Sequence, residues 1–377
     1  MSQPARVQPV AAEPSIENRL ARLLRRDVHD QTPIDDALVD EAFEHRVHFL
    51  LLDVRRSAPQ AAVFAPLRAR VAPLERHAVA VELIRALELR RVLELLALSG
   101  VRAVIFKGTA LAHSCYREPH LRPREDVDLL IREGDVDAAG RAFLSMGYAR
   151  TNLITGERVM PQRQYRRRCA SGVDHVYDVH SRLANPVLFS AALSFTEIER
   201  SAVSIPLGPH ARGPSLVHSL LIACGHRVAH HNDSPQLVWL HDIHALAGRM
   251  TAGEWCEFES LAETRNVRAA CWRGLTLAVQ AFATPLPPQL LDRLAQGRAD
   301  ASSAFIGGRN REIVVQWSNW RRLNGWPERR QLIVEHLLPS PSYMMARYGL
   351  ERRVWLPVWY VRRAVAGAVR WLRPMRR

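Results

Sequence analysis

The stretch Val104-Ile105-Phe106-Lys107-Gly108-Thr109, followed by Asp126-Val127-Asp128 eighteen residues after Gly108, decides the fold of this chain. A β-branched apolar run that breaks at a glycine indicates a buried strand that turns sharply into a helix. Residues 101–106 are therefore predicted to form a strand and residues 109–116 a helix. The apolar run at residues 127–131, next to the two aspartates, is predicted to form a second strand.

The same alternation continues beyond the second strand. Residues 135–146 have the spacing of an amphipathic helix that ends at Gly147, and residues 173–179 are predicted to form a third strand. The basic run at residues 163–168 lies between them and is predicted to be a loop. Strand, helix, strand, helix and strand in this order indicate a small α/β unit.

Helical spacing of apolar residues dominates on both sides of this unit. Residues 15–99 are predicted to be an N-terminal helical segment that ends at Ser99-Gly100, and residues 1–14, rich in Ala, Pro and Gln, are predicted to be disordered. Residues 206–340 are predicted to be a second helical region, followed by a basic aromatic tail at 341–377. Its candidate helices are 214–231, 235–249, 254–282 and 310–336.

Bulk composition narrows the class of protein. A chain of 377 residues with 47% hydrophobic and 24% charged residues is globular and long enough for two domains. Its net charge of +14 favours anionic partners: nucleotides, nucleic acid or an acidic membrane surface. The N-terminus has no apolar core of signal-peptide type, and no run of about 18 apolar residues predicts a membrane span.

The cysteines are odd in number and lack the spacing of metal ligands, so we expect reduced thiols. Reduced thiols indicate a cytoplasmic protein. Peripheral attachment to a membrane is a further possibility that the sequence leaves open. The cysteines are Cys115, Cys169, Cys224, Cys256 and Cys271.

The paired aspartates are the first candidates for chemistry. In a strand, Asp126 and Asp128 project to the same face, while Val127 points to the core. Two like charges so placed repel each other unless a cation lies between them, and Mg²⁺ prefers oxygen ligands of this kind. Asp178 and His180 repeat the spacing on the third strand, so a third carboxylate can complete the site. Solvation of a strand end is the alternative explanation for any one of these pairs.

Lys107 is the only lysine among 52 basic residues. A compact ammonium at a glycine turn, upstream of paired carboxylates, indicates a site that the planar fork of arginine would not fit. Chance placement in an arginine-rich chain is the alternative. Gly108 would let backbone N–H groups approach a phosphate, and Thr109 would cap the next helix or contact a phosphate oxygen. The spacing is not that of a P-loop.

The block from Phe106 to Leu130 resembles the uncharacterised nucleotidyltransferase family of the DNA polymerase β-type superfamily. The resemblance extends over about residues 75–250. It rests on Lys107, Gly108, Tyr116, Arg122, Asp126 and Asp128, then on Gly147-Tyr148 and Tyr177-Asp178-Val179-His180, and finally on His226, Trp239 and Asp242.

This resemblance implies an α+β fold, with a small nucleotidyltransferase core and a mixed sheet at residues 100–205. It also implies a reaction, the transfer of a nucleoside monophosphate from a nucleoside triphosphate, with Mg²⁺ or Mn²⁺ as cofactor. Asp126, Asp128 and Asp178 would hold the metal and carry catalysis, with Asp178 also a candidate general base. Lys107, Gly108, Thr109, Arg122 and His180 would bind the nucleotide.

Several alternatives stay open at this point. Lys107 would either neutralise the triphosphate or brace the carboxylates, and Arg122 would either pair with phosphate or be a surface arginine. The acceptor can be a small metabolite, peptide, protein, glycan or RNA. A catalytically inactive binding or scaffold protein is the second hypothesis, and a glycosyltransferase that holds a nucleotide-sugar metal at Asp126 and Asp128 is the third.

Two further features remain outside the α/β unit. His226 and His230 have the i, i+4 spacing of a metal chelate, but contacts between helices are the favoured interpretation. In residues 351–377 eight arginines interleave with tryptophans against the single acidic residue Glu351. That pattern fits an anionic membrane surface or a nucleic acid, or a C-terminal helix docked by its tryptophans with solvated arginines.

Overall fold

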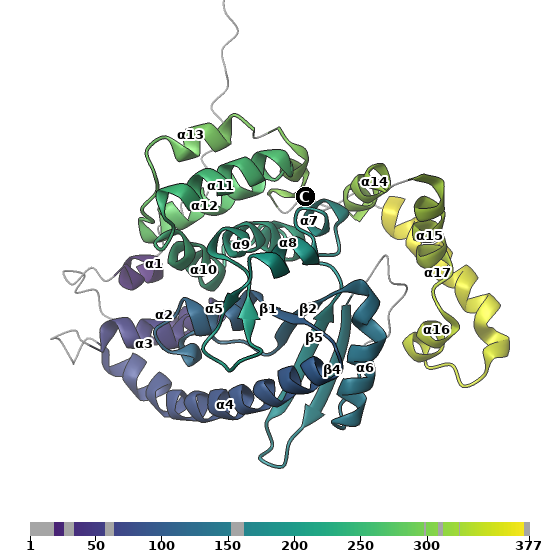
Figure 1. Ribbon diagram of the computed structural model, residues 1–377, viewed down its shortest axis with the longest axis horizontal. Coiled ribbons are helices and arrows are strands. Elements are labelled where there is room, and N and C mark those ends of the chain that lie inside the picture. Colours follow the sequence, from purple (N-terminus) through teal and green to yellow (C-terminus); the bar gives the residue numbers. More distant parts are fainter. Residues whose placement is uncertain are drawn as a thin grey trace, which may run out of the picture.

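The computed structural model describes residues 19–25, 34–56, 64–151, 162–297, 299–307, 312–323 and 325–372. The segment predicted to be disordered, residues 1–14, lies outside these ranges. The α+β class is confirmed, since helices surround one mixed sheet of five strands (Figure 1). A separate two-stranded sheet joins β6 (Val203–Ser204) to β7 (Arg212–Gly213).

The five-stranded sheet has the order β1-β2-β5-β4-β3. Strand β2 runs parallel to β5, whereas the β1–β2, β5–β4 and β4–β3 pairs are antiparallel, so the sheet is mixed as expected. The strands are β1 (Ala103–Phe106), β2 (Val127–Ile131), β3 (Ala149–Arg150), β4 (Gln162–Arg168) and β5 (Asp174–His180).

Strand β4 corrects one prediction, because the basic run at 163–168 is not a loop. Along this strand Arg163 pairs with Asp137, Arg166 with Asp174, and Arg167 with Glu88. These partners come from other elements of the fold. They let an arginine-rich segment lie in a sheet that would otherwise accumulate like charges.

Helices cover both faces of the sheet. The face that carries Leu129 and Val179 packs against α4 (Ala65–Leu98) and α6 (Val136–Ser145), through residues such as Leu93 and Phe143. The opposite face, with Val104, Phe106 and Leu130, belongs to the core of the helical half. Figure 1 shows α4 along the lower side of the sheet and α9 to α13 gathered above it.

The N-terminal and C-terminal helices share one hydrophobic core. Leu20 and Leu51, from the N-terminal segment, belong to the same buried cluster as Leu240, Leu275 and Phe282. The segments 15–99 and 206–340 therefore hold each other in place around the sheet. The N-terminal helices that precede α4 are α1 (Arg19–Leu24), α2 (Asp36–Glu44) and α3 (His48–Arg55).

The second half is helical, as predicted, with two corrections. The segment predicted as one helix at 310–336 contains two, α14 (Glu312–Arg322) and α15 (Gly325–Leu337). Residues 254–282 form two helices rather than one, because the chain breaks at Asn266, whose φ is 56°. Asparagine tolerates this left-handed conformation better than most residues. The helices are α5 (Lys107–Ser114), α7 (Val187–Ser190), α8 (Phe195–Arg200), α9 (Leu216–His230), α10 (Leu237–Ala247), α11 (Ala252–Thr264), α12 (Arg268–Phe282) and α13 (Leu290–Ala295).

Four more helices lie beyond residue 311 in the described ranges: α14 (Glu312–Arg322), α15 (Gly325–Leu337), α16 (Pro341–Tyr348) and α17 (Leu356–Leu372). They form a lobe at the right of Figure 1. All five cysteines are free thiols. Among the described helices, none has both the length and the apolar character needed to cross a membrane.

Candidate active site

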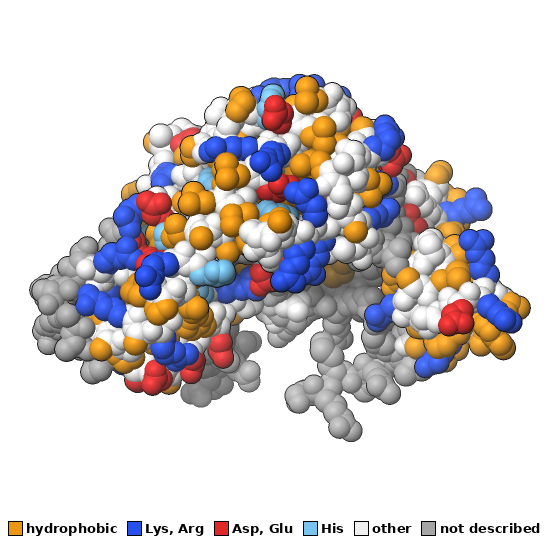
Figure 2. Space-filling model, turned by 90° about the horizontal axis from the view of Figure 1, so that it is seen from below, with side chains coloured by type: hydrophobic (Ala, Val, Ile, Leu, Met, Phe, Trp, Pro, Cys, Tyr) orange, Lys and Arg blue, Asp and Glu red, His pale blue; other side chains and the backbone are white. Residues whose placement is uncertain are grey.

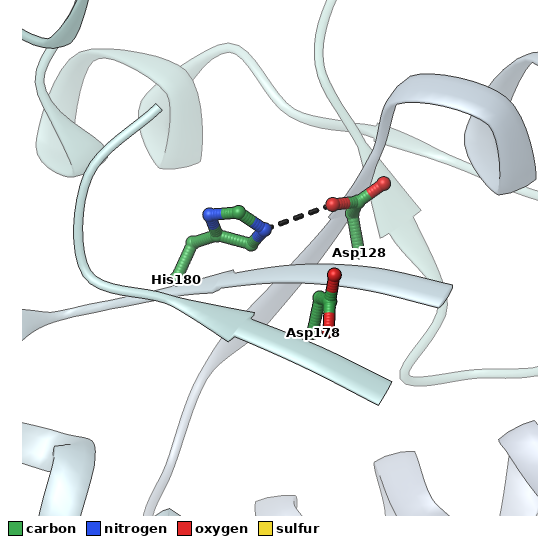
Figure 3. Close-up of side chains that lie close together, drawn as sticks. All are labelled: Asp128, Asp178 and His180. Carbon is green, nitrogen blue, oxygen red and sulfur yellow. Dashed lines mark hydrogen bonds and ion pairs between the residues drawn. The ribbon is translucent and has the colours of Figure 1, made fainter. Parts of the chain in front are cut away.

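The register of the sheet brings the predicted acidic residues together. Asp128 on β2 lies directly opposite Asp178 on the parallel strand β5, and His180 lies two residues further along β5. Side chains at paired positions, and at positions two apart, share one face of a sheet. Figure 3 shows Asp128, Asp178 and His180 side by side, with the imidazole of His180 turned to the carboxylate of Asp128.

These three residues form a candidate cation site. Asp128, Asp178 and His180 each offer a ligand atom, and the three atoms lie within 4.8 Å of one another. Asp126, which was predicted as a ligand with the other two aspartates, is not part of this group and lies next to it on the wall of the same cavity. His180 lies among the candidate metal ligands, and its predicted contact with nucleotide stays a prediction.

The charges around Asp128 are balanced within the protein. Lys107 Nζ lies 2.7 Å from Asp128 Oδ1, and His180 Nε2 lies 2.8 Å from the same oxygen. Burial on its own would raise the pKa of Asp128, but Lys107 and His180 hold that pKa well below its usual range. Burial, together with Lys107, lowers the pKa of His180 to about 4, so this imidazole is neutral near pH 7.

In the other two carboxylates burial outweighs the effect of Lys107 on the pKa. Burial, then repulsion from Asp128 and Asp178, raises the pKa of Asp126 to about 6. Burial also raises the pKa of Asp178, although Gln164 donates a hydrogen bond to it. A raised carboxyl pKa at two neighbouring positions marks a place where an added cation would be stabilised. Buried oxygen ligands of this kind suit Mg²⁺ or Mn²⁺.

The turn before α5 differs from the expected glycine turn. The residue with left-handed backbone is Lys107, whose φ is 56°, while Gly108 already belongs to the helix. A non-glycine residue holds this conformation only when its surroundings fix it. Here the side chain of Lys107 is held by Asp128 and by the ring of Phe106, whose centroid lies 4.7 Å from Nζ.

Thr109 contacts the protein rather than open space. Its side-chain hydroxyl donates to the backbone carbonyl of Asp126 over 3.3 Å and accepts a hydrogen bond from Arg124 Nε over 3.1 Å. The residue is buried. These bonds connect the first turn of α5 to the start of β2, so Thr109 positions Asp126. Its predicted contact with a phosphate stays a prediction.

Arg122 is buried and pairs with a carboxylate of the helical half. Its Nε donates to Asp242 Oδ1 over 2.9 Å and its Nη2 to Asp242 Oδ2 over 2.8 Å. The hydroxyl of Tyr116 donates to the same carboxylate over 2.7 Å. The surface-arginine alternative is therefore wrong. Contact of Arg122 with phosphate stays a prediction, while the structure shows that it connects the sheet to α10.

A cavity of about 480 Å³ separates the acidic row from the helical half. Asp126, Asp128 and Asp178 lie on the sheet side, with Lys107 and Gly108 at the start of α5. Arg122 and Arg124 line it near the turn between η2 (Pro119–Leu121) and β2. The helices α9 and α10 contribute the opposite wall, including Ser219, Ala223, His226, His230, His231 and Trp239.

The opposite wall is rich in neutral imidazole. The rings of His226 and His230 stack with centroids 4.9 Å apart, and His231 stacks on Trp239 at 3.8 Å. Burial lowers the pKa of His230 to about 3 and that of His231 to about 4. The sequence favoured packing between helices for His226 and His230. That packing is only part of their environment, because both rings also line the cavity.

The model of an uncharacterised nucleotidyltransferase family matches residues 34–283, which is more than half of the chain. The chain belongs to this family. A search of curated proteins found no match.

The family match includes the whole acidic row and both walls of the cavity. Its range ends at residue 283, after α12, so the helices α13 to α17 lie outside it. The resemblance expected from the short block around Lys107 and Asp128 is therefore confirmed. The matched range begins earlier than expected, at residue 34, and so includes α2 and α3 of the N-terminal segment.

Two residues of the candidate site were missed by sequence reasoning. Gln162 and Gln164 lie on β4 and both donate side-chain hydrogen bonds to the carboxylate of Asp178. Their register is direct, since Gln164 pairs with Asp178 and Gln162 with His180. The signal was present as two glutamines spaced by two residues. That spacing places both side chains on one face only in a strand, whereas the basic run at 163–168 predicted a loop.

Proposed function

We propose that the protein transfers a nucleoside monophosphate from a nucleoside triphosphate to a hydroxyl group of an acceptor, with Mg²⁺ as the cofactor and Mn²⁺ as a substitute. The observation that carries this proposal is the row of Asp126, Asp128 and Asp178, which opens into a cavity of about 480 Å³. A cavity of that size suits a nucleotide-sized ligand. Membership of a nucleotidyltransferase family supports the same reaction class.

The residues fit the metal that the family implies. Asp128, Asp178 and His180 offer clustered ligand atoms, and Asp126 adds a half-buried carboxylate whose pKa is raised by desolvation and by repulsion from the other two aspartates. When bound, a divalent cation supplies neutralisation of the triphosphate and stabilisation of the attacking and leaving oxygens. The metal ligands proposed are Asp126, Asp128 and Asp178, with His180 beside them.

The chemistry of the protein's own residues follows from their contacts. The acceptor oxygen forms a bond to the α-phosphorus, the bond from that phosphorus to the bridging oxygen of pyrophosphate breaks, and the acceptor proton goes to Asp178. Asp178 suits this because its raised pKa makes it a better proton acceptor than an ordinary aspartate. Gln162 and Gln164 fix the orientation of its two oxygens.

Lys107 supplies the positive charge nearest to the carboxylates. Its ammonium holds Asp128 ionised, and it lines the cavity where the phosphates would lie. Gly108 beside it exposes backbone at the start of α5, which favours an anion. Thr109 and Arg122 would assist, the first through Asp126 and the second through its place on the cavity wall. The wall of His226, His230 and Trp239 then faces the nucleoside or the acceptor.

The test is direct binding followed by transfer. Titration calorimetry with each of the four common nucleoside triphosphates, with and without Mg²⁺, should show binding that requires the metal. Asp126→Asn combined with Asp128→Asn should abolish it. Asp137→Asn is the matched control, because Asp137 is a carboxylate on α6 whose side chain is 81% exposed, and α6 packs against the face of the sheet that carries Leu129 and Val179.

A labelled-triphosphate screen against metabolite, peptide, protein, glycan and RNA acceptors then identifies the product. Binding that persists unchanged in the double variant would refute the site. Metal-dependent binding without transfer to any acceptor would support the inactive binding protein instead. Preference for a nucleotide sugar over every triphosphate would favour the glycosyltransferase.

A further inference from the structure

The helices after residue 311 carry an unusual share of the exposed apolar surface. Within the described ranges, eleven of the eighteen large hydrophobic side chains that are exposed lie at or after residue 317. The family match ends well before them, and none of them lines the cavity of the acidic row. Figure 2 shows this lobe at the right, with hydrophobic and basic side chains intermixed on its surface.

Helix α17 presents two faces with different environments. Trp359 packs in a tilted arrangement against Tyr348 of α16 with ring centroids 4.6 Å apart, and the hydroxyl of Tyr360 donates to the backbone carbonyl of Pro339. These aromatic side chains dock the helix onto its neighbour. The docked-helix interpretation of the tail is therefore correct for this face alone.

The other face of α17 has no such cover. Val358, Val361 and Val365 are spaced by three and four residues, so they form one stripe along the helix. Their exposed fractions are 58%, 65% and 58%, and Trp355, one turn before Val358, is 56% exposed. We refer to these four residues as the valine stripe.

Positive charge surrounds the valine stripe. Residues 341–377 contain nine arginines and one glutamate, so this segment supplies eight of the fourteen net positive charges of the chain. Arg352, Arg353 and Arg362 are exposed, and Arg362 lies over the ring of Trp359 with its guanidinium carbon 4.5 Å from the centroid. An exposed apolar stripe with arginines beside it and a tryptophan at one end matches helices that lie in the interface of an anionic bilayer.

We propose that the valine stripe and its flanking arginines dock the protein onto the surface of an anionic lipid bilayer, with α17 lying in the plane of the interface. The charge pattern argues against a second copy of the chain, because a symmetric dimer through this face would bring like-charged arginines together. It also distinguishes lipid from nucleic acid. Trp359 and Tyr360 are already engaged within the lobe, and valines cannot stack on bases.

Flotation of the full-length protein with vesicles tests this proposal. Vesicles of phosphatidylcholine alone should leave the protein unbound, and vesicles with about one third phosphatidylglycerol should bind it, with affinity that falls as salt is raised. Val361→Asp combined with Val365→Asp should lower the partition coefficient at least about tenfold. Arg352→Gln combined with Arg353→Gln should lower it about fivefold for each charge removed.

A matched control comes from α4. Leu83 and Leu87 have the same i, i+4 spacing, and their exposed fractions of 63% and 56% are close to those of Val361 and Val365. Leu83→Asp combined with Leu87→Asp should bind vesicles like the unchanged protein. An equal loss of vesicle binding in the two double variants would mean that any exposed apolar pair contributes to binding, and would overturn the proposal. Circular dichroism establishes that every variant is folded.

Other outcomes are equally decisive. Failure of the unchanged protein to float with anionic vesicles overturns the proposal, whether it instead shifts a labelled RNA or forms a dimer in light scattering. Because Asp126 and Asp128 lie far outside this lobe in sequence and on the sheet, replacing both by Asn should leave vesicle binding unchanged. The membrane proposal and the transferase proposal can therefore fail independently of each other.

Discussion

Lys107 Nζ lies 2.7 Å from Asp128 Oδ1, and the lysine that makes this contact has the left-handed backbone that glycine adopts most easily. The conformation costs about 1 kcal/mol or more for a residue with a Cβ atom. The chain therefore keeps a strained residue beside the acidic row, where glycine would have relieved the strain but would have removed the ammonium. That contrast makes Lys107 directly testable.

Lys107→Ala and Lys107→Gly both remove the ammonium, but only the glycine variant relieves the backbone. We expect both to weaken binding of a nucleoside triphosphate about ten- to a hundredfold, which is the range for a lost hydrogen bond to a charged group. We expect the glycine variant to be more stable than the alanine variant by about 1 kcal/mol. Calorimetry and urea unfolding measure the two effects, and equal stability of both variants would contradict the strain.

Lys107→Arg keeps the charge and changes its shape. Asp128 Oδ1 is already bonded to His180, and a planar fork is larger than a compact ammonium at the same place. We expect nucleotide affinity to fall severalfold in Lys107→Arg. Affinity and transfer as high as in the unchanged protein would mean that the lone lysine is an accident of composition.

Metal binding should stabilise the fold measurably. A ligand that binds only the folded state raises the free energy of unfolding by about 2.7 kcal/mol at a concentration one hundred times its dissociation constant. Mg²⁺ or Mn²⁺ should therefore raise the melting temperature, and a chelator should reverse the rise. Asp126→Asn combined with Asp178→Asn should remove the response, whereas Asp137→Asn should retain it. An identical shift in all three proteins would place the metal elsewhere.

The pair of Arg122 and Asp242 should matter for stability more than any surface ion pair. Asp242→Ala leaves a buried guanidinium without its carboxylate, which typically costs about 3–5 kcal/mol. Tyr116→Phe removes one of the hydrogen bonds to the same carboxylate and should cost about 1 kcal/mol. Urea unfolding measures both.

The control for this pair is Arg166→Ala, which breaks an exposed ion pair with Asp174 on the same sheet. We expect little change in its free energy of unfolding. A similar loss in Arg166→Ala and Asp242→Ala would show that burial of the pair adds nothing.

Stability should fall as the pH falls below about 6.5. Burial lowers the pKa of His48 to about 4, of His230 to about 3 and of His231 to about 4, and it lowers that of His226 as well. Histidine in the unfolded chain titrates near 6.5, so between about pH 6.5 and 4 the unfolded chain binds protons that the folded chain does not. The free energy of unfolding then decreases with falling pH.

Asp126 and Asp178 act in the opposite direction, because burial raises the pKa of each above its unfolded value, that of Asp126 to about 6, and this favours the folded state on acidification. The four histidines should outweigh the two carboxylates. Unfolding in urea at about pH 7 and about pH 5 measures the net effect. His230→Gln should make the dependence shallower, and an unchanged dependence would show that His230 is not held neutral in the folded protein.

The local pattern of the sequence was enough to predict the strands β1, β2 and β5. Strands β1 and β2 are short apolar runs bounded by a glycine or by carboxylates, and β5 follows Gly172 with Val176, Tyr177 and Val179. The placement of Asp126 and Asp128 on one face stays a prediction, because Asp126 precedes β2. The direct pairing of Asp128 with Asp178 could not be predicted, because it depends on the register of two parallel strands nearly fifty residues apart. The sequence identifies the two aspartates as candidates, but only the folded structure shows that they lie opposite each other.

The features that the sequence did not predict depend on contacts with residues from other elements. The basic strand β4 is acceptable in a sheet only because Asp137, Asp174 and Glu88 neutralise it, and none of those pairings follows from local periodicity. The pairing of Arg122 with Asp242 likewise joins residues 120 positions apart. The left-handed backbone of Lys107 has no local signal at all, since only its tertiary contacts make it tolerable.

The single lysine also gives the protein one addressable ε-amine, on the wall of the cavity that would receive the nucleotide. Growth on isotope-labelled lysine would therefore yield one side-chain resonance, and that resonance would come from the site itself. Occupancy of the cavity could be followed without an assay for the unidentified acceptor. A feature of composition thereby becomes a spectroscopic probe of whatever the protein binds.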